Sequence, residues 1–151
     1  MTSVSQKLRV IIDTNLFISS LLNKHGQPFA LMEAWYAEQF TLLMSAEQRA
    51  ELQDVVSRPR FIKRYPLSPF EADTLLTHID RWSQQVASAI ALPVAVRDAK
   101  DEKILASAIQ GAADYLITGD NDLLVLNGDP ALGMLKIVTV RDFLDILSSF
   151  S

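Results

Sequence analysis

Apolar residues follow two different spacings along the chain. Short apolar or β-branched runs, typical of buried strands, occur at residues 8–12, 41–44, 115–118 and 137–139. Between these runs, apolar residues recur every three or four positions, the spacing of a helix with one buried face. This helical spacing covers residues 17–22, 29–40, 45–57, 68–86, 101–111, 123–126 and 143–147. Strands that alternate with helices predict an α/β protein with a parallel sheet covered on both faces.

Local signals place the ends of several helices. Ser45, with Gln48 three residues later, predicts a capping box at the start of one helix, and Arg58-Pro59 predicts its end. Ser68-Pro69 predicts the start of the longest helix. Gly111 predicts the end of the helix that begins at residue 101.

The remaining segments are assigned from composition. Residues 90–96 are apolar and are expected to be extended around Pro93, whereas residues 127–133 are expected to form a surface connection. Trp35 and Trp82 lie on apolar helix stripes, so we expect them in the core or at a dimer interface.

The overall composition is that of a compact globular protein. With 151 residues, 49% of them hydrophobic, the chain is expected to form a single domain over residues 1–151. It contains no apolar stretch that resembles a signal peptide or that is long enough to span a bilayer. We therefore expect a soluble cytoplasmic protein without membrane contact.

Cysteine, histidine and net charge restrict the chemistry. The chain has no cysteine, and with only His25 and His78 a zinc site is not expected, so any metal must be held by oxygen. The formal net charge of −4 argues against binding nucleic acid through overall positive charge. A nuclease would therefore need two local clusters, acids at a metal and bases around it.

Acidic residues stand at the carboxyl ends of two predicted strands. Asp13 ends the first strand, and Asp120 and Asp122 follow the third. Glu51 lies on the helix after the second strand, and Asp101 lies at the start of the helix before the third. Because the carboxyl ends of parallel strands face one crevice, these acids are expected to converge if the strands are neighbours.

Converging carboxylates repel one another unless a cation or protons neutralise them. Mg²⁺ prefers oxygen ligands, and in nucleases it generates a hydroxide nucleophile or clamps the attacking and leaving oxygens. Considered alone, Asp13 is a turn or cap residue, Glu51 an exposed helix residue, and Asp101 a charge at a helix N-terminus. The prediction of a metal site therefore depends on their joint placement.

Four blocks of the sequence, in order, resemble the PIN domain, and the resemblance covers nearly the whole chain. The blocks are VIIDTNLFI (10–18), Glu51-Leu52 with RPRF (58–61), DAKDEKILASA (98–108) and ADYLITGDNDL (113–123). The chain looks especially similar to bacterial and archaeal PIN proteins regarded as toxins of toxin–antitoxin pairs, relatives of the VapC toxins. One block alone is a weak signal, whereas four with family-like spacing are specific.

The resemblance implies a three-layer α/β/α fold around a central parallel sheet of about five strands. It also implies an Mg²⁺- or Mn²⁺-dependent endoribonuclease with an RNA substrate, an antitoxin partner and a homodimeric state. The implied catalytic acids are Asp13, Glu51, Asp101 and Asp120, and the implied metal ligands are these four with Asp122. The residues implied to orient the carboxylates or their waters are Thr14, Asn15 and Thr118.

Two of these assignments have close competitors. Asp101 is preferred over Asp98 because it stands three residues before Ile104, as the family's third acid stands before its helix. Asp98 is then expected to be a loop or cap residue. Asp120 and Asp122 can both reach a metal, so they are treated as a pair.

The chain has one concentrated positive stretch, residues 58–65. It supplies four candidate contacts to RNA phosphates, and either Phe61 or Tyr65 can stack on a base. These four cations are Arg58, Arg60, Lys63 and Arg64. The same stretch is equally well explained as cations at a helix C-terminus, or as a contact for an acidic antitoxin segment.

The sequence leaves three candidate functions. The leading one is hydrolysis of single-stranded or looped RNA without a covalent enzyme intermediate. The second is phosphoryl transfer through Asp13, but phosphatases of that kind need a second Asp two residues on, where this chain has Asn15. The third is an RNA- or protein-binding module without catalysis, and the intact set of acids argues against it.

Overall fold

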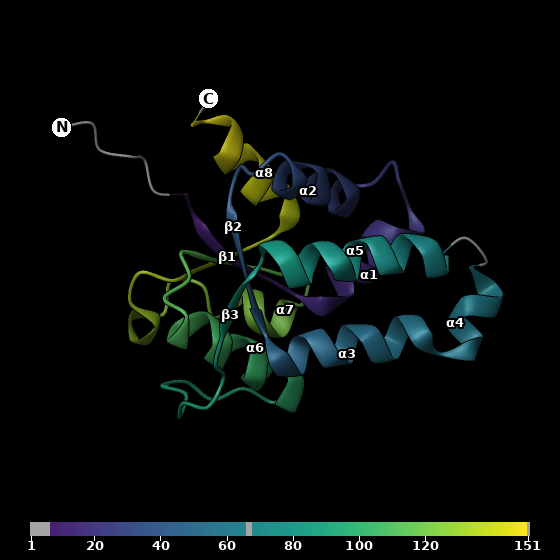
Figure 1. The fold of residues 1–151 in the computed structure, drawn as a ribbon. Coiled ribbons are helices and arrows are strands. Elements are labelled where there is room, and N and C mark those ends of the chain that lie inside the picture. Colours follow the sequence, from purple (N-terminus) through teal and green to yellow (C-terminus); the bar gives the residue numbers. More distant parts are fainter. Residues whose placement is uncertain (1–6, 66–67, 151) are drawn as a thin grey trace.

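A five-stranded parallel sheet lies at the centre of the molecule (Figure 1). The computed structural model describes residues 7–65 and 68–150. The strands are β1 (Arg9–Ile12), β2 (Thr41–Ser45), β3 (Gln84–Val86), β4 (Tyr115–Ile117) and β5 (Lys136–Val138). Their order in the sheet is β3-β2-β1-β4-β5, and every pair is parallel. The order reverses at β1 and β4, which is where α/β sheets open a crevice beyond the carboxyl ends of their strands.

Helices cover both faces of the sheet, which confirms the predicted three-layer α/β/α fold. The α-helices are α1 (Thr14–Leu22), α2 (Gln27–Tyr36), α3 (Ala46–Ser57), α4 (Pro59–Arg64), α5 (Ser68–Trp82), α6 (Ala99–Gln110), α7 (Asn121–Leu124) and α8 (Val140–Ser148). Helices α1, α2, α3, α5 and α8 contribute to one apolar core. Helices α6 and α7 contribute to the second core, on the opposite face (Figure 1).

The central strands β1, β2 and β4 are largely apolar because both of their faces are buried. In β1, Val10 and Ile12 belong to the first core and Ile11 to the second. In β2, Leu42 and Leu43 divide between the two cores in the same way. This alternation follows from the period of two along a strand, and it explains why the sequence shows continuous apolar runs.

The predicted helix at residues 68–86 is wrong at its end. Helix α5 ends at Trp82, and residues 84–86 form the edge strand β3, which pairs with β2. The backbone N–H and the hydroxyl of Ser83 both donate to the carbonyl oxygen of Ile79, in the last turn of α5. Residues 90–96 contain no regular secondary structure, although Leu92, Val94 and Val96 still pack against the second core.

One further prediction is wrong, and two others miss a short element. Helix α2 ends at Tyr36 rather than at residue 40, because Glu38 adopts a left-handed φ of 60° that cannot continue a helix. Arg58-Pro59 ends α3 as predicted, but Pro59 also opens the short helix α4, since its fixed φ suits a first helical position. The connection at residues 127–133 includes a 3₁₀ turn (Pro130–Leu132) whose Leu132 is buried.

The two tryptophans have different environments. Trp35 is buried in the first core, as predicted, whereas Trp82 is 62% exposed and lies outside it. Within the described residues, every helix is too short or too polar to cross a membrane. The expected single domain over residues 1–151 includes residues 1–6, 66–67 and 151, which lie outside the described part of the chain.

Candidate metal centre

A cleft of about 580 Å³ opens beyond the carboxyl ends of β1, β2 and β4. Its acidic lining residues are Asp13, Glu47, Glu51, Asp98, Asp101 and Asp120. The structure thus brings together four of the five predicted ligands from four separate elements. The fifth, Asp122, lies beside Asp120 at the start of α7.

Asp13 is held by neighbours on two sides. It directly follows β1 and caps α1, so its Oδ1 accepts a hydrogen bond from the Asn15 backbone N–H at 3.2 Å. Its Oδ2 accepts a hydrogen bond from the Thr118 hydroxyl at 2.7 Å. Its backbone N–H donates to the Ile117 carbonyl oxygen, which ties the end of β1 to the end of β4. The Asp13 carboxylate therefore has one defined orientation at the floor of the cleft.

Thr118 connects the Asp13 carboxylate to the next acid. Its side chain is fully buried, and its hydroxyl oxygen accepts from the Asp120 backbone N–H at 3.0 Å while the hydroxyl donates to Asp13. Asp120 in turn caps α7, because its Oδ1 accepts from the Asp122 backbone N–H at 2.9 Å. Of the three predicted supporting residues, Asn15 acts through its backbone, and Thr14 is buried in the cleft wall.

Asp101, Asp120 and Asp122 form the tightest acidic cluster. One carboxylate oxygen of each lies within 4.8 Å of those of the other two. Asp101 is only 7% exposed, and its buried Oδ2 has no hydrogen-bond partner. Such a group favours either a proton or a cation.

Burial, a hydrogen bond with Asp120 and the negative charges of Asp120, Asp98 and Asp13 together raise the pKa of Asp101 from 3.8 to about 7, and burial contributes most. Two ionised carboxylates cannot hydrogen-bond, so without a metal a shared proton stabilises the pair. The same negative potential that retains the proton also attracts a divalent cation.

The remaining acids are less tightly placed. Glu51 lies half-buried on α3 and lines the cleft, but like Asp13 it stands outside the 4.8 Å cluster. Its Oε1 lies 3.6 Å from the Lys100 Nζ. Asp98 is exposed and caps α6, as predicted, since its Oδ1 accepts from the Lys100 backbone N–H at 2.8 Å.

Gln48 is a cleft residue whose environment was not foreseen. Ser45 accepts a hydrogen bond from the Gln48 backbone N–H, as the capping box predicts. However, the Gln48 side chain donates from Nε2 to the Ile12 carbonyl oxygen at 2.5 Å instead of returning to Ser45. Its Oε1 is buried without a hydrogen-bond partner. The only signal in the sequence is its position one helical turn before Glu51, which places both on one face of α3.

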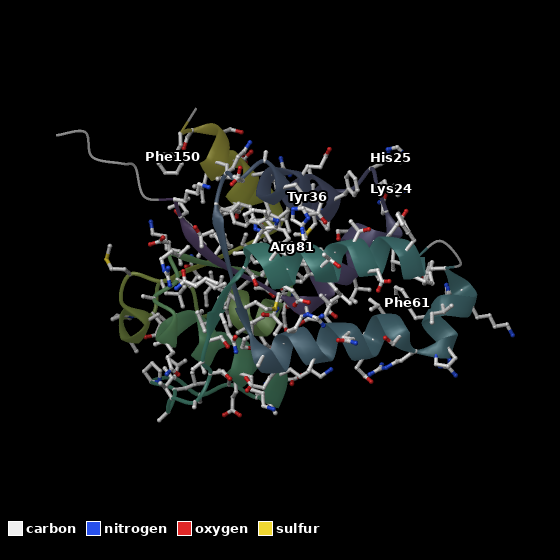
Figure 2. The ribbon with its side chains drawn as sticks, in the orientation of Figure 1. Lys24, His25, Tyr36, Phe61, Arg81 and Phe150 are labelled. Atoms are coloured by element: carbon white, nitrogen blue, oxygen red, sulfur yellow. The ribbon has the colours of Figure 1, made fainter. Side chains whose placement is uncertain are left out.

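The positive stretch at residues 58–65 lies at the other end of α3 (Figure 1). Arg58 pairs with Asp54 at 2.7 Å, and Lys63 and Arg64 stand in the last turn of α4, where cations complement a helix C-terminus. Phe61 packs against the first core beside the ring of Tyr65 (Figure 2). Phe61 is therefore only partly exposed.

Comparison with known proteins identifies relatives of the fold. The model of the PIN domain matches residues 9–122. An uncharacterized protein of Methanocaldococcus jannaschii is 27% identical over 149 residues, which cover 95% of this chain and 94% of that protein. Among solved structures, a chain of VapBC2 from Rickettsia felis superposes on this chain with a TM-score of 0.57. In that structure VapBC2 is bound to a DNA fragment from its promoter. That alignment has 17% identity and covers 87% of this chain and 98% of the other.

Proposed function

Because the chain belongs to the PIN domain family, we propose that it is a metal-dependent endoribonuclease that acts as the toxin of a toxin–antitoxin pair. Nucleases are typical of this family. The observation that carries the proposal is Asp101, a buried carboxylate with an unpartnered oxygen beside Asp120 and Asp122. A carboxylate placed in this way adds nothing to the stability of the fold without a cation or proton, whereas a nuclease needs it.

The residues of the cleft fit a hard divalent cation, Mg²⁺ or Mn²⁺. All candidate ligands are carboxylate oxygens, which are the ligands that these ions prefer. Asp101, Asp120 and Asp122 would hold the ion, and Asp13 and Glu51 complete the acidic wall of the cleft. When bound, such a cation supplies Lewis acidity toward the phosphodiester and promotes ionisation of the attacking water.

The protein's own contribution is orientation and charge. Thr118 and the Asn15 backbone N–H hold the two oxygens of Asp13, so this carboxylate does not reorganise during the reaction. Gln48 ties α3 to the end of β1 and thereby sets the distance between Glu51 and Asp13. Asp13, Glu51, Asp101 and Asp120 are in this proposal the catalytic acids.

The cellular partners belong to the same proposal. A VapBC2 structure shares the fold, and this likeness supports the proposal of an antitoxin partner for the chain. The homodimeric state stays a prediction from the resemblance to the PIN domain. The exposed cations of α4, Arg60, Lys63 and Arg64, are candidate contacts for RNA or for an acidic antitoxin segment. One domain over residues 1–151 accords with a single sheet whose strands run from residue 9 to residue 138.

Cleavage of single-stranded RNA by the purified protein tests the function. Cleavage is expected with Mg²⁺ or Mn²⁺, to stop with EDTA, and to be lost in Asp13→Asn and Asp101→Asn. The matched control is Asp73→Asn, which removes an exposed carboxylate on α5 away from the cleft. An Asp101→Asn protein that cuts RNA as fast as the Asp73→Asn control would refute the proposal.

A further inference from the structure

Three cations stand at the rim of the acidic cleft. Arg97 precedes α6, and Lys100 and Lys103 lie in its first turns, three residues apart and therefore on one helix face. All three are exposed, and Lys100 and Lys103 line the cleft itself. We call these three residues the α6 rim.

Two cations of the α6 rim are paired with candidate metal ligands. The Lys100 Nζ lies 3.6 Å from Glu51, and the Arg97 Nη2 lies 3.9 Å from Asp122. Both pairs are long, and the Lys100 and Arg97 side chains are 76% and 88% exposed. Exposed pairs of this geometry contribute little to stability, so a stronger partner can displace either member.

We propose that the α6 rim binds phosphates of single-stranded RNA, and that Arg97 and Lys100 leave Asp122 and Glu51 for these phosphates when a divalent cation occupies the cleft. This inference rests on the proposed function. With Asp122 and Glu51 neutralised in this way, the Arg97 and Lys100 side chains would be free to bind another anion. Metal binding and RNA binding are thereby coupled through the same two carboxylates.

The position of the α6 rim favours RNA over an acidic protein segment. An RNA whose scissile phosphate lies over the carboxylates places its neighbouring phosphates at the edge of the same cleft, where the rim stands. An acidic segment would bring further carboxylates to a cleft that six carboxylates already line. The cations of α4 are farther away, since α4 begins eight residues after Glu51, or about 12 Å along a helix axis.

The first measurement is RNA affinity by fluorescence anisotropy, with labelled single-stranded RNA of mixed sequence and Ca²⁺ in place of Mg²⁺. Each lost phosphate contact reduces the steepness of the plot of log affinity against log salt concentration by about 0.7. At about 0.1 M salt, this corresponds to RNA binding that is about fivefold weaker. Arg97→Gln and Lys100→Gln are each expected to show this loss. Lys136→Gln is the matched control, because it removes an exposed cation at the opposite, amino end of the strands.

The second measurement is a titration of the same proteins with Mn²⁺ alone. Lys100→Gln removes a competitor for Glu51, so it is expected to bind Mn²⁺ at least as tightly as the wild type while it binds RNA more weakly. A merely structural role for Lys100 would weaken both. Loss of Mn²⁺ binding in Lys100→Gln would therefore overturn the inference.

Three further outcomes distinguish the proposals. If the wild type cleaves RNA but Arg97→Gln and Lys100→Gln bind it as tightly as Lys136→Gln, the α6 rim is refuted and the proposed function stands. If the wild type neither binds nor cleaves RNA, both fail. Displacement of the RNA by polyglutamate at equal charge concentration would refute the RNA assignment and indicate an acidic protein partner.

Discussion

Replacing Asp101 with asparagine is expected to stabilise the metal-free protein at about pH 8. The side chain is 7% exposed, and its pKa is raised to about 7 by burial, by Asp120 and by nearby negative charges. Above that pH the folded protein must hold a charged, buried carboxylate, which costs free energy. Asparagine has the same shape without the charge, so Asp101→Asn removes this cost.

The sign and size of the effect follow from linkage. Because the folded state binds the Asp101 proton more tightly than the unfolded state, the contribution of Asp101 to stability is highest below pH 3.8 and falls as the pH rises to about 7. The full difference corresponds to roughly 4 kcal/mol as an upper bound, and water at the open cleft reduces it to about 1–3 kcal/mol. For a domain of this size we expect Tm to rise by roughly 3–10 °C.

Thermal denaturation in EDTA, between about pH 5 and pH 8, measures this effect. Asp101→Asn should exceed the wild type at high pH and lose that advantage as the pH falls, while Asp73→Asn follows the wild type throughout. With Mn²⁺ at about 100 times its Kd, the wild type should gain roughly 2.7 kcal/mol and Asp101→Asn much less. An Asp101→Asn protein less stable than the wild type at pH 8 in EDTA would refute the reasoning.

Three other substitutions probe the same architecture. Thr118→Val keeps the shape of the side chain but loses both hydrogen bonds of the hydroxyl. The free energy of unfolding should therefore fall by about 1–3 kcal/mol, and kcat should fall with it. Unchanged cleavage would contradict the positioning role of Thr118. Gln48→Leu loses the hydrogen bond to the Ile12 carbonyl oxygen, so the free energy of unfolding, measured with denaturant, should fall by about 1–3 kcal/mol. An unchanged free energy of unfolding would show that this hydrogen bond is unimportant. Gly111→Ala should lower the free energy of unfolding by about 1–3 kcal/mol in the same assay, because the added Cβ would lie 2.9 Å from Cγ1 of Val86. An unchanged denaturation midpoint would show that Val86 moves freely.

The sheet and its order of layers were predictable because the strands are buried on both faces. Runs such as residues 10–12 are continuous and apolar, and Asp13 interrupts its run at the point where the chain leaves the sheet. The position of Asp13 at a strand end could therefore be predicted from local pattern alone. Glu51 has no such local mark, and its candidate role came from its placement together with the other acids and from the resemblance.

The strand β3 could not be predicted because its residues carry no strand signal. Gln84 and Gln85 are polar and exposed, and the preceding helical stripe continues through Trp82. What makes these residues a strand is pairing with β2, some forty residues away in the chain. Pairing of that kind depends on the assembled sheet rather than on local propensity.

The side-chain partners in the cleft were also beyond local pattern. Gln48 has the sequence position of a capping box, but the folded chain places the Ile12 carbonyl oxygen within its reach. Likewise, nothing near Lys100 in the sequence indicates that Glu51 is its partner. The acidic residues could be predicted as a set, whereas the contacts that orient them depend on how α3 and α6 approach β1.

The initial rate of RNA cleavage as a function of Mn²⁺ concentration tests the central claim most directly, with the wild type and Asp101→Asn measured side by side. A carboxylate-held metal predicts a saturable rise for the wild type, and for Asp101→Asn no cleavage above the level in EDTA. A wild-type rate that EDTA leaves unchanged, or an Asp101→Asn curve that matches the wild type, would contradict the account.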